Sequence, residues 1–296
     1  MTGPGARPQI PSRIGPYAVV TALDADATPT VAERRCIARS RDGDRTVVLS
    51  LPPSGADHDR WVAEATAARH LALPGLVRIT ELDTSPALPW YGIDYRPLLA
   101  LPAVLGAHGG PLPEHTVRAL GASLASTLAL AHAQDVTHAG LSPEAVLLGT
   151  EGPRIGCFGA ARVATPDGTV RSGLPWLNAA CLAPEQASGG RPRPPGDVYA
   201  LGAVLAYAST GHTVPELTEL PPSLRSPVSR CLSRDAAQRP PASRLAEELA
   251  GAAAAAPRAT VLDVSAPIPL PGKVIAALAR QSAALLAADI RLEPRM

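Results

Sequence analysis

Lysine, asparagine and phenylalanine are almost missing from this chain of 296 residues, in which Lys273, Asn178 and Phe158 are the only residues of their kinds. A lysine in the main body that would grip a phosphate group or form a Schiff base is therefore excluded. The 4 cysteines lie far apart without a closely spaced pair, which argues against a zinc site and against a disulfide framework.

Neither charge nor hydrophobicity is concentrated in this chain. Basic and acidic residues number 27 and 26, so no polycationic surface predicts nucleic acid or anionic lipid as a partner. No apolar run reaches the roughly 18 residues that a transmembrane helix needs, and residues 1–9 lack the apolar segment of a secretory signal. We therefore expect a cytoplasmic protein without a membrane span.

Two hydrophobic patterns divide the chain. Short alternating and β-branched runs predict strands in its first third, with one helix among them. The predicted strands cover 17–21, 36–39, 46–51, 76–81 and 90–95, and the helix covers 59–71. Further on, apolar residues recur at helical spacing over 115–133 and over 198–208. These patterns predict an α+β fold with a small strand-rich lobe and a larger helical lobe.

The two ends of the chain differ in composition from its body. Residues 1–13 are rich in glycine, proline and arginine, which predicts a flexible leader. Residues 251–271 are rich in alanine and proline and are expected to form a linker. A C-terminal amphipathic helix and tail are predicted over 272–296, with Ile275, Leu278 and Leu285 on the apolar face of the helix.

A series of short motifs occurs between residues 14 and 250. They lie at 14–17, 47–51, 64, 138–148, 157–159, 183–187, 197–202 and 231–240. Their order and spacing resemble those of the bacterial Hanks-type serine/threonine protein kinases. The resemblance implies the bilobal protein-kinase-like fold for residues 14–250, with a small lobe of about 14–96 and a large lobe of about 97–250.

The residues that perform phosphotransfer in this family are replaced here. The resemblance places Ser50 at the phosphate-binding lysine, Gly140 at the catalytic aspartate and Cys157 at a magnesium-binding aspartate. The remaining motif positions hold Glu64 (helix glutamate), Ala139 (arginine), Ser142 (loop lysine) and Ala145 (magnesium-binding asparagine). The glycine-rich phosphate loop is replaced by a segment that contains Asp24 and Asp26. The resemblance therefore implies no catalytic residue, no enzymatic activity, no metal site, and binding of ATP and magnesium that is absent or very weak.

Residues that support the kinase architecture are kept. The resemblance gives structural roles to His138, Phe158, Gly159, Glu185, Asp197 and Arg239. It implies that Asp197 anchors the backbone of the catalytic loop and that Glu185 and Arg239 form a buried ion pair.

A degenerate nucleotide cleft is implied between the lobes. Its residues are expected to be Arg35, Val48, Asp94 and Tyr95. Arg35 stands where a smaller apolar residue would cover an adenine, so we expect its side chain to fill the cleft.

These features predict a pseudokinase that acts in bacterial signalling as a protein-binding scaffold or regulator, with an active kinase or its substrate as the partner. Two alternatives stay open: a nucleotide-binding pseudokinase switch and an unconventional active serine/threonine phosphotransferase. The second alternative would need a relocated acid or base, for which Asp135 and Glu144 are the candidates near the catalytic loop.

Two further hypotheses concern single side chains. Cys157 and His138 could form a nucleophile pair, although Cys157 is expected to be a small buried apolar residue. Thr165, Thr169 and Ser172 lie in the segment where kinases are phosphorylated, and we expect them to be solvated loop residues. Without the motif arginine, a phosphate in this segment would lack its usual partner.

Overall fold

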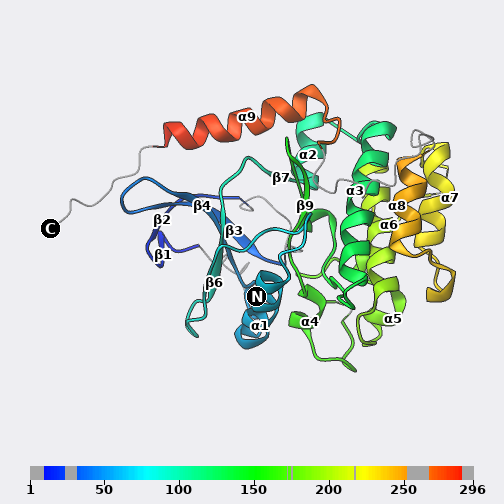
Figure 1. Ribbon diagram of the computed structural model, residues 1–296, viewed down its shortest axis with the longest axis horizontal. Helices are drawn as coiled ribbons and strands as arrows, with labels where there is room; N and C mark the ends of the chain where they lie inside the picture. The colour runs from blue at the N-terminus through cyan, green and yellow to red at the C-terminus, as the bar shows by residue number, and fades with distance from the viewer. Residues whose placement is uncertain are drawn as a thin grey trace, which may run out of the picture.

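The computed structural model describes residues 10–23, 32–171, 173–174, 176–216, 218–251 and 267–288. It shows a strand-rich lobe beside a helical lobe, which confirms the predicted α+β bilobal fold (Figure 1). Several predictions lie outside the described residues. They are those for the first nine residues of the leader, for Asp24, Asp26 and Ser172, for most of the linker and for the tail beyond residue 288.

The small lobe is built on an antiparallel sheet with the strand order β1-β2-β3-β4-β6-β5. Its strands are β1 (Arg13–Ile14), β2 (Tyr17–Ala22), β3 (Arg34–Ser40), β4 (Thr46–Leu51), β5 (Glu81–Asp83) and β6 (Trp90–Asp94). Helix α1 (His58–Leu71) begins at Asp57, whose side chain accepts a hydrogen bond from the Arg60 backbone N–H. Trp61 of α1 stacks on Tyr91 of β6 with 5.4 Å between the ring centroids, which fixes the helix against the sheet.

The predicted strand over 76–81 is wrong over most of its length. Leu76 forms only an isolated bridge with Ile155, and the Val77 N–H donates to the carbonyl of Ile155 at 3.0 Å. The backbone at residues 76 and 77 is therefore paired with the large lobe. The Thr80 N–H donates to the Gly92 carbonyl of β6 at 2.8 Å, and β5 begins at Glu81.

The large lobe has a helical core. Its longer helices are α2 (Leu101–His108), α3 (Glu114–His132), α6 (Pro194–Thr210), α7 (Pro222–Cys231) and α8 (Ala242–Ala250). Helix α3 packs against α6 and α8, and its residues Val117, Leu120, Leu124 and Leu128 are fully buried, as their spacing predicted. Of the two short helices, α4 (Ala160–Ala164) contacts α1, and α5 (Pro184–Ala187) lies near the beginning of α6 (Figure 1).

A small second sheet and three single 3-10 turns complete the large lobe. The strands are β7 (Leu99–Ala100), β8 (Val146–Gly149) and β9 (Gly152–Ile155), in that order. The turns are η1 (Pro143–Ala145), η2 (Ala179–Cys181) and η3 (Ala236–Gln238). Residues 95–98, which join β6 to β7, connect the two lobes and are called the hinge below.

Helix α9 (Gly272–Ala287) lies across both lobes on one side of the molecule (Figure 1). Its buried residues are Val274, Leu278 and Leu285, whereas the side chain of Ile275 is 48% exposed. The prediction that placed Ile275 on the apolar face is therefore wrong, because Ile275 is rotated by about 100° from Val274. No helix in the described ranges is long and apolar enough to cross a membrane.

Candidate functional site

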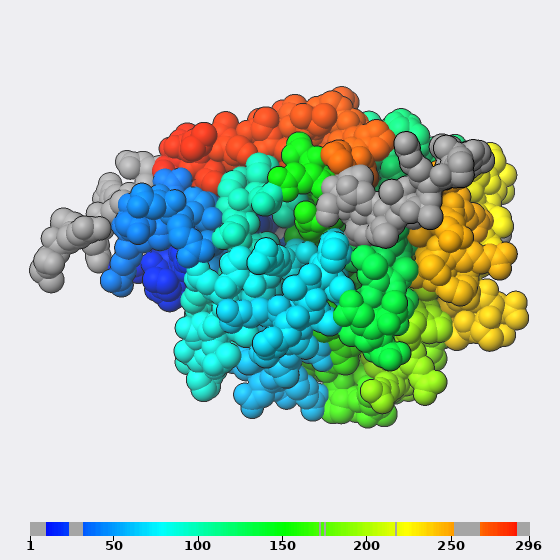
Figure 2. Space-filling model, viewed as in Figure 1, coloured from blue at the N-terminus to red at the C-terminus, as the bar shows by residue number. Residues whose placement is uncertain are grey.

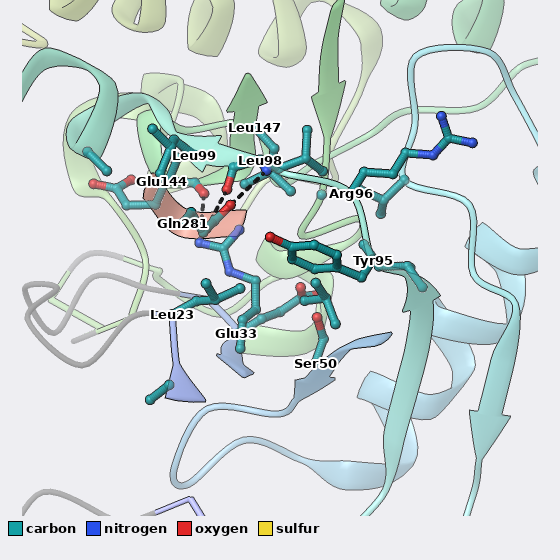
Figure 3. A pocket seen from close by; sticks show the side chains of 18 of the residues that line it. Leu23, Glu33, Ser50, Tyr95, Arg96, Leu98, Leu99, Glu144, Leu147 and Gln281 are labelled. Carbon is teal, nitrogen blue, oxygen red and sulfur yellow. Dashed lines mark hydrogen bonds between the residues drawn. The ribbon is translucent and has the colours of Figure 1, made fainter. Parts of the chain in front are cut away.

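A cavity of about 430 Å³ lies between the lobes, beside the hinge (Figure 3). The residues that line it come from β3, β4, β6, the hinge, α2, the segment before β8, and α9. Those that matter for its chemistry are Glu33, Arg35, Ser50, Tyr95, Glu144 and Gln281. Val48, Ile93 and Leu147 supply apolar walls. The cavity has the size of a small-molecule site.

Arg35 projects into this cavity from β3 and is only 4% exposed. It lies opposite Ser50 of β4 in the sheet register, so both side chains lie on the same sheet face. The Arg35 Nη2 donates to the backbone carbonyl of Glu144 at 3.3 Å. A side chain of the small lobe thus reaches the large lobe across the cavity.

Acidic and phenolic oxygens also line the cavity. The Glu33 carboxylate accepts a 2.6 Å hydrogen bond from the Tyr91 hydroxyl. Complete burial, together with the nearby Glu33 charge, raises the pKa of Tyr91 well above its usual range. The Tyr95 hydroxyl and the Glu144 Oε2 are buried and have no hydrogen-bond partner within the described part of the chain. Asp94, which was expected near the cleft, is exposed at the end of β6 and does not line the cavity.

Glu64 of α1 forms a bidentate ion pair with Arg162 of α4. Both of its oxygens accept hydrogen bonds at 2.7 Å, from the Arg162 Nε and Nη2. Arg162 also donates to the Thr137 carbonyl at 3.0 Å, and its guanidinium lies 5.0 Å from the centroid of the Phe158 ring. Because Ser50 has no positive charge, the arginine after the 157–159 motif neutralises Glu64 instead.

The catalytic-loop backbone is tied to α6 by Asp197. The two carboxylate oxygens of this buried side chain accept hydrogen bonds from the backbone N–H groups of His138 and Ala139, at 2.7 and 2.8 Å. The His132 Nε2 lies 2.9 Å from the same carboxylate. The His138 ring meets Phe158 edge to face, with 5.5 Å between centroids. Burial lowers the pKa of His138 to about 4.

The loop positions that carry replaced motif residues are closely packed. A Cβ atom on Gly140 would overlap the carbonyl oxygen of Cys157, so no larger side chain fits there without movement. Ala139 and Cys157 both have positive φ angles, 56° and 59°, which non-glycine residues rarely adopt. Ser142 caps the η1 turn by accepting a hydrogen bond from the Ala145 N–H.

The structure does not support the Cys157–His138 nucleophile pair or Asp135 as a relocated acid or base. Neither ring nitrogen of His138 has a hydrogen-bond partner in the described ranges, so His138 does not accept the thiol proton of Cys157. Asp135 is exposed in a left-handed turn after α3 and is not among the cavity residues. Of the two relocated acid or base candidates, only Glu144 lines the cavity.

Glu185 and Arg239 form a bidentate pair, with distances of 2.6 and 2.9 Å. Burial alone would raise the pKa of Glu185, but the hydrogen bonds from Arg239 lower it overall. The expected ion pair is present but only one partner is buried, because the Glu185 side chain is 39% exposed while that of Arg239 is fully covered. Glu185 lies on the short α5 at the edge of the lobe, where solvent reaches its carboxylate.

Arg171 is a buried residue that the sequence analysis missed. Its guanidinium donates to the backbone carbonyls of residues 161, 165, 186 and 190 and to the side chain of Asp167. This draws the 160–190 segment inward, and the hydroxyl of Thr165 is buried, against the expectation of a solvated residue. Thr169 is exposed, as expected. No chemical pattern singles out one arginine among many for such a role.

No cluster of three or more histidine, cysteine or acidic residues that could hold a metal ion occurs within the ranges that the structure describes. The carboxylates in the cavity come from Glu33 and Glu144.

Comparison with known proteins identifies relatives over most of the chain, although no family model matches it. It is 32% identical over 264 residues to the probable serine/threonine-protein kinase PkwA of Thermomonospora curvata, an alignment that covers 82% of this chain and 35% of that protein. It is 30% identical over 258 residues to the serine/threonine-protein kinase AfsK of Streptomyces coelicolor, covering 81% of this chain and 32% of that protein. The chain thus spans about a third of the length of these relatives.

The fold has a solved counterpart. The kinase domain of PknI from Mycobacterium tuberculosis superposes with a TM-score of 0.61 at 18% sequence identity, covering 83% of this chain and 99% of that domain. At this identity the likeness concerns the fold alone.

The expectation that this chain is not an enzyme is contradicted by the relatives. PkwA and both AfsK proteins that align with it are named serine/threonine protein kinases.

Proposed function

Because the chain belongs to the bacterial Hanks-type serine/threonine protein kinase family, we propose that it acts in signalling as a regulator that binds a protein partner. One observation carries this proposal: two charged side chains of the small lobe form bonds to the large lobe. Arg35 bonds across the cavity to Glu144, and Glu64 pairs with Arg162. These bonds join the two lobes, so the outer surfaces of the lobes keep one arrangement that a partner can bind. An active kinase or a kinase substrate is the partner class that we propose.

We further propose that ATP with magnesium binds this cavity weakly or not at all. Ser50 provides no positive charge opposite the phosphates, and the carboxylates of Glu33 and Glu144 would repel them. Arg35 also takes up space in the cavity where the family resemblance places a nucleobase. These observations support weak binding, and a binding measurement tests it.

Thermal unfolding in the presence of ligands is the direct test. A ligand at 100 times its dissociation constant stabilises a folded protein by about 2.7 kcal/mol, which shifts the midpoint of a chain of this size by several degrees or less. We expect no shift with millimolar ATP and magnesium. Arg35→Val should instead give a shift with adenosine, since the variant clears the cavity without adding a phosphate site. A shift of the unmodified chain with ATP and magnesium would contradict the proposal.

The partner class is tested separately. Purified chain would be titrated calorimetrically against the purified serine/threonine kinases encoded in the same genome, and against their substrates. We expect a dissociation constant in the micromolar range or below for at least one of them. Failure of every kinase and substrate to bind would refute this partner class.

Phosphotransfer is the second candidate function, favoured by the names of the relatives and by the sheet register. Arg35 lies opposite Ser50 on the same sheet face, so its guanidinium could supply the positive charge that the lysine provides in the family. Transfer of radiolabelled phosphate from ATP should then be abolished by Arg35→Gln and by Glu144→Gln. Label that persists unchanged in both variants would come from a contaminating kinase and would refute this candidate.

A further inference from the structure

The first half of α9 is anchored on the large lobe. Val274 and Leu278 are buried in the same apolar cluster as the core of α3 and α6, and α9 packs on α2. Just before the helix, the Thr116 hydroxyl donates a 2.7 Å hydrogen bond to the Pro269 carbonyl. The beginning of α9 is therefore fixed to the large lobe.

The middle of α9 contacts the hinge. The Gln281 Nε2 donates to the Leu98 carbonyl at 3.2 Å, and the Gln281 Oε1 accepts from the Leu98 N–H, also at 3.2 Å (Figure 3). One carboxamide thus satisfies both backbone groups of a single hinge residue. The same Gln281 side chain lines the cavity, so α9 forms part of the cavity wall.

The last turn of α9 is anchored on the small lobe. Leu285 is buried in the apolar cluster that contains Ile37 of β3 and Val48 of β4. Arg39 of β3 donates from its Nη2 to the Leu285 carbonyl at 3.2 Å. This guanidinium lies at the C-terminal end of the helix, where the helix dipole favours a positive charge.

The geometry points to α9 as an interlobe strap that fixes the angle between the lobes and closes the cavity beside the hinge. Figure 2 shows the helix lying over both lobes on one face of the molecule. A helix of 16 residues is about 24 Å long and rigid, so the lobes cannot rotate about the hinge while both of its ends stay attached. Release of the strap from the small lobe is the switch that frees the lobes and opens the cavity. This inference holds whichever partner or ligand the chain has.

Two adjacent leucines provide a matched test in the full chain. Leu285 is buried against the small lobe, whereas Leu286 is 82% exposed. Leu285→Asp should release the last turn of α9, while Leu286→Asp adds the same charge to the same turn without breaking a contact. The distance between the lobes would be measured by paired spin labels at Asp59→Cys on α1 and Glu247→Cys on α8, both exposed positions. The four native cysteines are buried, so the spin label reacts with the two introduced cysteines.

We expect Leu285→Asp to broaden the distance distribution and to speed hydrogen exchange of the Leu98 amide by about tenfold, the factor that corresponds to loss of one hydrogen bond. Leu286→Asp should match the parent protein in both measurements. If exchange of the α9 amides shows that the helix has detached but the distance distribution is unchanged, the strap is refuted. Equal effects of the two variants would also refute it.

A second variant covers the case in which Leu285→Asp does not fold. Gln281→Ala removes only the two hinge bonds and leaves the apolar anchors in place. It should speed exchange of the Leu98 amide to a similar extent, whereas Arg280→Ala, an exposed neighbour on the same helix, should not. Unchanged Leu98 exchange in Gln281→Ala would show that α9 does not hold the hinge.

Discussion

Acidification should destabilise this protein through one histidine, His138. Its imidazole is buried beside Phe158 and its two nitrogens have no hydrogen-bond partner in the described part of the chain. Burial lowers its pKa from 6.5 to about 4, so it stays neutral in the folded protein at pH values where the unfolded chain already binds a proton. The unfolded state therefore gains protons as the pH falls, and stability is lost between about pH 6.5 and pH 4.

The size of this effect follows from the two pKa values. Between pH 7 and pH 5, a histidine whose pKa falls from 6.5 to about 4 on folding lowers the free energy of unfolding by about 2 kcal/mol. Urea unfolding at both pH values gives the loss for the parent protein. His138→Phe keeps a ring against Phe158 and should lose about 2 kcal/mol less than the parent. A change in packing that alters the free energy of unfolding equally at both pH values cancels, because the parent and the variant are compared by their loss between pH 7 and pH 5.

An exposed histidine is the control for this comparison. His70→Gln on α1 removes one histidine from the surface and should leave the pH dependence of the parent unchanged. If His138→Phe loses as much stability in acid as the parent does, the buried imidazole is not the cause and the reasoning fails.

Three substitutions and one control, Gly106→Ala, test other contacts by urea unfolding at pH 7. Gly140→Ala should cost about 3 kcal/mol, because its Cβ would overlap the Cys157 carbonyl, whereas Gly106→Ala in α2 meets no atom and should stabilise the protein by about 0.5–1 kcal/mol. Glu185→Gln should cost about 2 kcal/mol, because Glu185 is partly exposed and Arg239 keeps bonds to backbone carbonyls. Arg171→Met should cost more than about 3 kcal/mol, because it leaves buried carbonyls without donors.

Each of these substitutions has an outcome that contradicts its premise. Equal stability of Gly140→Ala and Gly106→Ala would mean that the catalytic loop is looser than its contacts indicate. A loss near 4 kcal/mol in Glu185→Gln would be the value for a fully buried ion pair and would contradict the partial exposure of Glu185. A neutral Arg171→Met would show that solvent can replace all five of its acceptor contacts.

The elements that the sequence predicted well depend on local periodicity. Val117, Leu120, Leu124 and Leu128 lie one helical turn apart, and any helix containing them must bury that stripe. Ile275 shows where this reasoning ends. In α9, both Ile275 and Val274 have a helical spacing to Leu278 and Leu285. Only the packing of the helix against the two lobes determines that Val274 is the buried one.

The contacts that the sequence did not predict join residues far apart in the chain. Arg162 and Glu64 are separated by 98 residues, and Gln281 and Leu98 by 183. Ser50 stands where the family has a lysine, but nothing in the sequence near Ser50 or Glu64 indicates that Arg162 pairs with Glu64. A glutamine in an alanine-rich helix gives no signal at all before the helix is placed beside the hinge.

The position of Lys273 has a practical consequence for anyone handling this protein. It is the only lysine in the chain and it is exposed in the first turn of α9, where its Nζ donates to the carbonyl of His108 at 3.4 Å. Among the side chains, amine-reactive dyes, biotin esters and surface-coupling chemistries will therefore attach only at this one, in addition to the α-amino group, and will remove its charge. A sensor surface prepared in that way holds the molecule by the very helix that joins its lobes, whereas coupling through an engineered cysteine on α8 leaves that helix unmodified.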